Sequence, residues 1–337
     1  VRKGEFAYNP ARVNVGSIGQ LRDAEEVAVS SLYVCVSVDG KVDGEFFNAW
    51  TKSRDFYKET VRNTEGSVRE YLFYENFANM RIPIPTVAEQ QKIAEILKAY
   101  DRMIELKQSK IDELNKLKQV CLLEMFPQKD QTIPKRRFPG FSAPWEQRKV
   151  SDLAEKTYGG GTPTTSNEAY WNGDIPWIQS SDVVDGKLLG VESRKRITQD
   201  GLNNSAAQLI PENSIAIITR VGVGKLAFMP YSYATSQDFL SLSKLNAEPF
   251  FTVYACYKKL QSELNAVQGT SIKGITKDEL LAKSIMVPQY AEQRQIGAFF
   301  KQLDHLITLH QRELAEVGKY KKALMQLLLT GLVRVNA

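Results

Sequence analysis

The stretch TVAEQQKIAEILKAYDRMIELKQSKIDELNKLKQVCLLEMF, residues 86–126, predicts one long helix, which at about 1.5 Å per residue would be roughly 60 Å long. Thr86-Val87-Ala88-Glu89 fits a capping box, in which the Thr86 hydroxyl accepts from the Glu89 N–H and the Glu89 side chain reaches back. Apolar residues then recur at alternating steps of three and four, the spacing of a coiled-coil seam, meaning the line of positions that faces a partner helix. The seam positions are Leu97, Tyr100, Ile104, Ile111 and Leu114, with polar interruptions at Lys107 and Lys118.

The same pattern returns about 200 residues later. Ala88-Glu89-Gln90 is repeated as Ala291-Glu292-Gln293, and Pro85 is repeated as Pro288. The second seam comprises Phe300, Leu303, Ile307, Leu314 and Val317, with polar interruptions at His310 and Lys321. These interruptions fall where the lysines fall in the first copy. We therefore expect two copies of one helix that pack on each other, antiparallel because repeats related by a pseudo-twofold axis point their helices oppositely.

Composition places the chain among ordinary globular proteins. A length of 337 residues favours two domains, and 43% apolar with 25% charged residues is sufficient for folded cores. No apolar run approaches the roughly 18 residues of a membrane span. The three cysteines match no metal spacing and favour a reducing cytoplasm. The net charge of +5 permits an anionic partner without requiring one.

The parts of the chain outside the long helices read as short strands with few helices. We expect strands at residues 5–8, 32–38, 80–84, 175–178, 214–219, 239–242 and 284–288, and helices at 46–62 and 250–260. The repeat extends into these parts, since Val13-Asn14-Val15-Gly16 resembles Val221-Gly222-Val223-Gly224. The expected fold class is α+β.

The repeat is incomplete at its front. The second copy begins near Phe138 and runs about 70 residues before it reaches the part equivalent to residue 1. A strand-rich fragment lacking that part would expose sheet edges. We expect the first domain to be completed in one of two ways. The chain is part of a longer parent chain, or it associates with a second copy or with a companion fragment.

The connector after the first helix is rich in proline and basic residues. Its run Lys135-Arg136-Arg137 is most simply a solvated linker, and contact with a polyanion is the alternative.

Several polar residues lie in turn-like positions that suit DNA contact. The glycine loop at residues 159–161 lacks the spacing of a phosphate-binding P-loop, and a DNA-facing loop or a plain surface loop are both compatible with it. Arginine reads guanine in the major groove, lysine serves phosphate, and threonine hydroxyls reach either. Each residue alone is more often a solvated side chain. The candidates are Thr162, Thr164, Thr165, Arg194, Lys195, Arg196, Thr219, Arg220, Lys225, Gln237 and Lys273, with Arg12 and Asn14 in the first copy.

Catalytic patterns are missing from the sequence. The only histidines are His305 and His310, on or near the helix seam, where packing is the simplest role. Asn9-Pro10-Ala11-Arg12 does not match the N-P-P-[YF] motif of amino-group methyltransferases. We expect no catalytic residues, no metal and no cofactor, which favours a protein that reads its target over one that modifies it.

Three motifs together resemble the specificity (S) subunit of type I restriction–modification enzymes. They are Pro85 with Ala88-Glu89-Gln90-Gln91-Lys92-Ile93, Trp145-Glu146-Gln147-Arg148-Lys149-Val150, and Gly161-Thr162-Pro163 with Gly173-Asp174-Ile175-Pro176-Trp177-Ile178. The resemblance covers essentially the whole chain. It implies two target recognition domains of mixed α/β type, each reading one half of a split site in double-stranded DNA. The antiparallel helices would set the distance between the halves.

The resemblance also implies partners and boundaries. Methyltransferase (modification) subunits would dock and methylate adenine, restriction subunits would join, and the chain itself would be non-catalytic and cytoplasmic. The expected segments are a partial first recognition domain (1–84), a first long helix (85–127), a basic linker (128–149), a complete second recognition domain (150–287) and a second long helix (288–331). The alternatives are a coiled-coil scaffold or adaptor without DNA binding and, less favoured, an enzyme acting alone.

Overall fold

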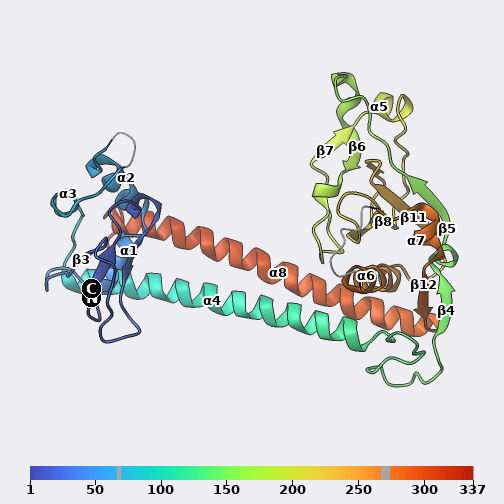
Figure 1. Cartoon of the computed structure of the whole chain (residues 1–337), viewed down its shortest axis with the longest axis horizontal. Helices are drawn as coiled ribbons and strands as arrows, with labels where there is room; N and C mark the ends of the chain where they lie inside the picture. Colours follow the sequence, from blue (N-terminus) through green and yellow to red (C-terminus); the bar gives the residue numbers. More distant parts are fainter. Residues whose placement is uncertain (67–69, 267–273, 337) are drawn as a thin grey trace. The chain divides into compact units, whose positions relative to one another are not determined.

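The chain divides into two compact units. The computed structural model describes residues 1–66, 70–266 and 274–336. Unit 1 comprises Val1–Ile111 and His310–Ala337, and unit 2 comprises Asp112–Leu309. The two longest helices, α4 (Val87–Glu124) and α8 (Tyr290–Leu329), contribute to both units (Figure 1). Within the described residues, no helix is both long and apolar enough to cross a bilayer.

The two long helices pair antiparallel, and charged contacts fix their register. In unit 1, Lys321 of α8 pairs with Asp101 of α4. In unit 2, the Nζ of Lys118 on α4 lies 2.6 Å from Oδ1 of Asp304 on α8. Within unit 1, the α8 partners descend from Lys321 to Glu313 as the α4 residues ascend from Asp101 to Lys107, so the two helices run in opposite directions.

The seam follows the three-and-four spacing of the sequence. Leu97, Ile111, Leu114, Phe300, Leu303 and Ile307 are buried, and Tyr100, Ile104, Leu314 and Val317 are half-buried. The polar interruptions lie beside carboxylates: the Lys107 Nζ is 2.8 Å from Oε2 of Glu313, and the His310 Nδ1 is 3.1 Å from the same oxygen. Each lysine that interrupts the seam therefore has a carboxylate partner, which offsets part of its desolvation.

Unit 1 is built on an antiparallel sheet in the order β2-β1-β3. Its elements are β1 (Phe6–Tyr8), η1 (Val13–Val15), β2 (Ile18–Gln20), β3 (Val34–Val36), α1 (Gly44–Trp50), α2 (Arg54–Asn63) and α3 (Tyr74–Ala78). Phe6 and Tyr8 on one face of the sheet pack with Phe47 and Trp50. Ala7 on the opposite face lines an open groove of about 370 Å³.

Two elements of unit 1 differ from the sequence prediction. The helix expected at residues 46–62 is two helices, because Ser53 caps the second by accepting a backbone N–H with its hydroxyl. The strand expected at residues 80–84 is irregular. Its counterpart in unit 2, β12 (Ser284–Val287), is a strand because it pairs with β4 (Glu146–Lys149). No described segment of unit 1 pairs with residues 80–84 in this way.

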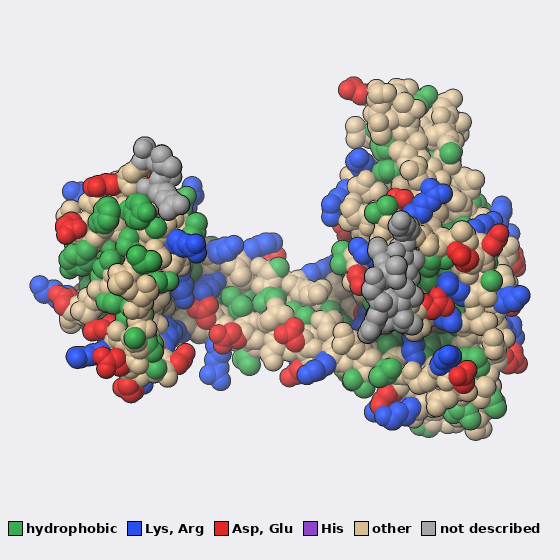
Figure 2. Space-filling view, viewed as in Figure 1, with side chains coloured by type: hydrophobic (Ala, Val, Ile, Leu, Met, Phe, Trp, Pro, Cys, Tyr) green, Lys and Arg blue, Asp and Glu red, His purple; other side chains and the backbone are tan. Residues whose placement is uncertain are grey.

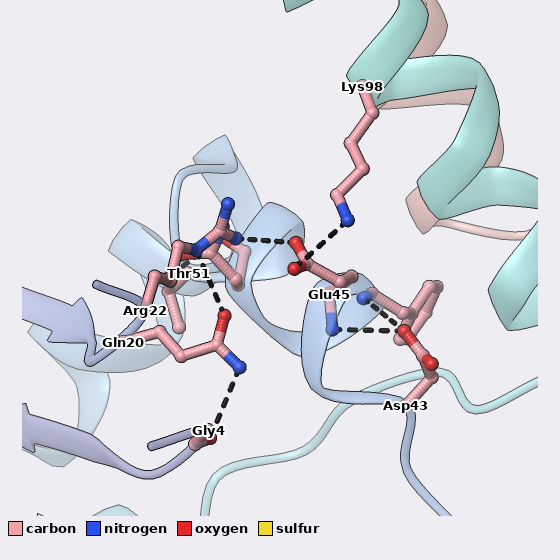
Figure 3. A network of polar contacts seen from close by, with 9 residues as sticks. Gly4, Gln20, Arg22, Asp43, Glu45, Thr51 and Lys98 are labelled. Atoms are coloured by element: carbon pink, nitrogen blue, oxygen red, sulfur yellow. Dashed lines mark hydrogen bonds and ion pairs between the residues drawn. The ribbon is translucent and has the colours of Figure 1, made fainter. Parts of the chain in front are cut away.

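A network of polar contacts fastens the sheet of unit 1 to α1 and α4 (Figure 3). The Gln20 amide donates to the Gly4 carbonyl at 3.1 Å and accepts from the Arg22 Nε at 3.2 Å. Arg22 also pairs with Glu45 of α1, and the Nζ of Lys98 on α4 lies 3.0 Å from the same carboxylate. Glu45 therefore joins the sheet side of the unit to the long helix.

Within the described residues, unit 2 holds three sheets. Its main sheet has the order β5-β11-β8-β9, a second has the order β10-β6-β7, and β12 pairs with β4. The elements not yet given are η2 (Val150–Leu153), β5 (Ala154–Gly159), η3 (Glu168–Tyr170), β6 (Trp171–Ile178), η4 (Ser180–Asp182), β7 (Lys195–Ile197), α5 (Gln199–Asn203), β8 (Ser214–Ile218), β9 (Leu226–Met229), β10 (Ala234–Thr235), β11 (Phe239–Leu245), α6 (Pro249–Ala266) and α7 (Lys277–Ala282).

The main sheet of unit 2 is covered on both faces. Ile215 and Ile217 of β8 pack into the cluster that includes Phe251 of α6, whereas Ala216 and Ile218 pack into a second cluster. Strands β9-β8-β11 have the same order and antiparallel pairing as β2-β1-β3 of unit 1. The repeat seen in the sequence therefore extends to the sheets.

Candidate nucleic-acid interface

The turn between β8 and β9 is anchored at its first residue. The Thr219 N–H and hydroxyl donate to the Asp238 carbonyl at 2.8 and 3.1 Å, and the Thr219 carbonyl accepts from the Ile275 N–H at 2.7 Å. Glycines with φ of 90° and 92°, Gly222 and Gly224, complete the turn in a region that favours glycine. The Thr219 hydroxyl, predicted to contact DNA, is buried and donates to the Asp238 carbonyl, so the residue anchors the turn from within the protein.

Arg220 and Gln237 lie at the same end of the main sheet. Ile218 pairs with Phe239 across β8 and β11, so the residues that follow β8 and precede β11 are neighbours. Arg220 and Gln237 are exposed, and Lys225, at the other end of the turn, is half-buried. Three of the predicted DNA-binding residues are therefore brought together here, whereas Lys273 lies outside the described residues.

The glycine loop after β5 is fixed by close packing. A Cβ on Gly160 would lie 1.8 Å from the Ser236 carbonyl oxygen, and a Cβ on Gly161 would lie 2.2 Å from the backbone of Ala206. The Trp177 indole N–H also donates to the Gly161 carbonyl at 3.0 Å. These glycines are required for the close approach of two backbones, so packing within the protein accounts for their presence in the loop.

The threonines of this loop differ in exposure. Thr162 is half-buried, whereas Thr164 and Thr165 are exposed. Gly161 donates its N–H to Thr235 at 2.8 Å, and Thr235 precedes Ser236 and Gln237 in the chain. The loop therefore begins beside the segment that carries Gln237.

The basic run at residues 194–196, which leads into β7, is engaged within the protein. The Lys195 Nζ lies 5.5 Å from the ring centroid of Trp171, and the Arg194 Nε lies 3.4 Å from Oδ1 of the buried Asp182. The Arg196 guanidinium donates to the carbonyls of Gly173 and Asp174. All three cations remain exposed to solvent, so their internal contacts do not prevent an approach to phosphate.

Unit 1 carries a corresponding hairpin between β1 and β2. Arg12 is exposed and Asn14 is half-buried on its turn. The Arg12 carbonyl accepts from the N–H groups of Val15 and Ser17, both at 3.1 Å, and Gly16 has a φ of 89°. Figure 2 shows lysine and arginine side chains interspersed with acidic ones on the face in view, without one dominant basic surface.

The linker's basic run is held by carboxylates. Lys135 and Arg136 lie 2.7 and 3.0 Å from Glu124 at the end of α4. The Arg137 guanidinium donates to both oxygens of Glu292, each at 2.7 Å, and this carboxylate raises the pKa of Arg137. A solvated linker was the simpler expectation for this run and a polyanion contact the alternative; the Lys135 and Arg136 side chains are indeed largely exposed, whereas Arg137 is buried against Glu292.

The repeated Ala-Glu-Gln motif holds together the start of each long helix. Gln90 donates to the Pro85 carbonyl at 2.9 Å and accepts from the Asp43 N–H at 2.7 Å. Gln293 makes the same two contacts, to the Pro288 carbonyl at 2.8 Å and from the Glu248 N–H at 2.9 Å.

The glutamates of the motif bind arginines that follow the opposite helix. Glu292 binds Arg137 as described, and Glu89 accepts from Arg334 and from the Val335 N–H. The Thr86 hydroxyl accepts from the Glu89 N–H at 3.3 Å as expected, but the Glu89 carboxylate is directed to Arg334 instead of reaching back. The repeat of the motif was visible in the sequence, whereas its long-range partners were not.

The sequence also did not predict a buried polar cluster in unit 2. Lys118 donates to the Gly186 carbonyl at 2.9 Å besides pairing with Asp304. The Tyr254 hydroxyl donates to Oδ2 of Asp304 at 2.6 Å, and burial followed by the Asp304 charge raises the pKa of Tyr254. The lysine interruption in the seam was the available sequence signal. In the described ranges, acidic, cysteine and histidine side chains form no cluster suited to a metal ion.

Comparisons with known proteins identify the family. A family model described as "Type I restriction modification DNA specificity domain" matches residues 7–116 and 143–319. The putative type I restriction enzyme MjaX specificity subunit of Methanocaldococcus jannaschii is 26% identical over 273 residues, which are 77% of this chain and 60% of that protein. The EcoR124I/EcoR124II specificity subunit of Escherichia coli is 28% identical over 243 residues, 68% of this chain and 57% of that protein. The chain thus spans about 60% of the length of these relatives.

Solved structures show the same fold. The type I restriction–modification S subunit from M. genitalium has a TM-score of 0.61 at 13% identity, covering 98% of this chain and 83% of that one. The HsdS subunit from Thermoanaerobacter tengcongensis has a TM-score of 0.50 at 20% identity, covering 99% and 82%. The family match covers most of the chain in both repeats, and so the chain belongs to the family of type I restriction–modification DNA specificity domains.

Proposed function

We propose that this chain is the DNA-recognition subunit of a type I restriction–modification complex, and that it reads a split site in double-stranded DNA. The observation that carries the proposal is the anchored β8–β9 turn, which presents the exposed Arg220 beside Gln237 in a chain of this family. An arginine on a fixed turn can donate to O6 and N7 of a guanine in the major groove, and Lys225 can serve a phosphate.

The proposal assigns the chemistry to partners. Methyltransferase subunits would methylate adenine and restriction subunits would cleave, with the paired helices α4 and α8 as the frame on which they assemble. The chain would act in the reducing cytoplasm, in keeping with its free cysteines. Residues 150–287 would form a complete recognition domain and residues 1–84 part of another.

A DNA-binding measurement tests the proposal. The full chain, assembled with its methyltransferase subunits, should retain DNA carrying its methylation site over unrelated DNA, with affinity that falls steeply as salt rises. Arg220→Ala should cost about 1–3 kcal/mol of binding to the site and relax selection at one position. The matched control is Arg148→Ala on β4, since Arg148 is exposed and pairs with Glu146, 2.9 Å away.

Two results would reject parts of this proposal. Assembly of the complex without any sequence-selective retention of DNA would favour a coiled-coil scaffold. If the Arg220→Ala variant binds DNA with normal selectivity, Arg220 is not part of the interface, although the chain still recognises DNA.

A further inference from the structure

Asp238 lies at the same end of the main sheet as Arg220, and the sequence did not mark it as a DNA-binding residue. Its carbonyl accepts both the N–H and the hydroxyl of Thr219, at 2.8 and 3.1 Å, and Thr219 immediately precedes Arg220. This contact bonds the turn between β10 and β11, which carries Asp238, to the turn between β8 and β9. In the part of the chain that the structure describes, no ion pair joins the Asp238 carboxylate to Arg220, so neither charge neutralises the other.

The Asp238 carboxylate is held in place by its own turn. The Phe239 N–H donates to the Ser236 carbonyl at 3.4 Å, and the Ser236 N–H donates to the Ile178 carbonyl at 2.9 Å. The hydroxyl of the buried Ser236 donates to Oδ2 of Asp238 at 3.2 Å, whereas Asp238 itself is only half-buried. An acceptor that is fixed before binding loses little conformational freedom in a complex.

A carboxylate at a DNA interface is selective about what it contacts. It accepts hydrogen bonds and donates none, and the phosphates repel it. In the major groove only cytosine N4 and adenine N6 are amino donors, and adenine carries the N7 acceptor beside its amino group. Cytosine is therefore the base that best suits a carboxylate, as guanine is the base that best suits an arginine.

We propose that Asp238 accepts a hydrogen bond from the N4 amino group of a cytosine in the half-site read by unit 2. Guanine or thymine in place of that cytosine would present a carbonyl oxygen to the carboxylate, so the contact rejects these bases as well as favouring cytosine. This inference rests on the proposed function and adds to it a second base and the residue that selects it.

A base analogue tests the contact with the unchanged chain in its assembled complex. Replacement of cytosine by 2-pyrimidinone removes the amino group and leaves the rest of the ring in place. At one cytosine of the half-site this change should weaken binding about tenfold, within the range that a specific base contact is worth. The same analogue in the flanking DNA should have no effect.

The Asp238→Asn variant should change the selected base without disturbing the turn. Asparagine keeps a side-chain oxygen for the Ser236 hydroxyl and the backbone carbonyl for Thr219, and it gains an amide donor. Because asparagine reads adenine through N6 and N7, the preferred base at that position should change from cytosine to adenine. The readout is binding to duplexes that carry each of the four base pairs at each position of the half-site, since a purely structural role would weaken binding to all of them alike.

Glu212→Gln is the matched control. Glu212 is exposed in the segment that precedes Ser214, the first residue of β8, and so lies at the opposite end of that strand from Arg220. This variant removes one negative charge from unit 2, as Asp238→Asn does, and should leave the base preference at every position unchanged.

The outcomes separate the inference from the function. A half-site without cytosine, binding that is insensitive to loss of the amino group at every cytosine of the half-site, and an unchanged cytosine preference or a uniform change in affinity in Asp238→Asn would each overturn the inference and leave DNA recognition intact. Loss of all sequence selectivity in the unchanged complex would instead overturn the proposed function together with the inference.

Discussion

Glycine loops have two physical causes that a sequence does not separate. A loop such as residues 159–161 contains glycine either because a ligand needs a close backbone or because another part of the protein does. Here Gly160 and Gly161 face the backbones of Ser236 and Ala206, so the second cause applies. Thr219 has the same ambiguity, since its hydroxyl is bonded internally to the Asp238 carbonyl. This ambiguity between a ligand contact and an internal contact does not arise for exposed candidates such as Arg220.

Gly160→Ala should destabilise unit 2. The new Cβ would lie 1.8 Å from the Ser236 carbonyl oxygen, and relief of such overpacking costs about 1–3 kcal/mol or more. Gly159→Ala is the control, because a Cβ at that neighbouring position meets nothing within 4 Å. Urea unfolding followed by fluorescence should place the Gly160→Ala midpoint clearly below that of Gly159→Ala. Equal midpoints would contradict the packing described for this loop.

Glu89 should make stability depend on pH. The Arg334 guanidinium, followed by the Val335 N–H, lowers the pKa of Glu89 from 4.5 to about 2. A carboxylate with a lowered pKa in the folded state contributes stability above its unfolded pKa and loses that contribution as the pH falls from about 4.5 towards 2. Glu89→Gln should therefore lower the melting temperature at about pH 6, and the difference from the unchanged chain should shrink at about pH 2.5.

Glu95→Gln is the control for this titration. Glu95 lies on the same helix and pairs only with Lys92, 3.4 Å away among the described residues, with both side chains largely exposed. It should change the melting temperature little at either pH. A Glu89→Gln deficit that stays constant with pH would show that the carboxylate charge is not what stabilises the contact.

At the scale of elements, periodicity predicted the long helices well because it reports burial directly. Steps of three and four place every seam position on one face, and those positions are buried or half-buried. Short strands were predicted less well, because a strand needs a partner. Residues 80–84 and 284–288 each lead into a long helix, but only the latter pair with a neighbouring strand, β4.

Leu114→Asp should disrupt the helix pair. Leu114 is 8% exposed and packs with Leu303 and Ile307, so a carboxylate there would be buried among apolar side chains at a cost of about 3 kcal/mol or more. Leu117→Asp is the control on the same helix, because Leu117 is 47% exposed. Thermal melting followed by circular dichroism should show a large loss for the first variant and a small one for the second. Similar losses would contradict the seam assignment.

At the scale of the whole molecule, the repeat could be predicted from the sequence because its motif and its seam defects recur together. The ion pairs made by the glutamates of the repeated motif could not be predicted, because they join residues far apart in the chain. Arg137 with Glu292 and Arg334 with Glu89 are the examples, since no local pattern marks an arginine as the partner of a distant glutamate. The family resemblance supplied the expectation of DNA recognition, and the structure supplies the anchored turns on which that proposal now depends.

The central claim is that this chain selects the DNA sequence its complex modifies. The most direct test is a genome-wide map of methylated adenine in cells that carry the complex with the unchanged chain, without the chain, and with Arg220→Ala. We predict a split motif with the unchanged chain, no such motif without it, and relaxation of a single position in one half of the motif with Arg220→Ala. A motif that persists unaltered when the chain is removed would contradict the account.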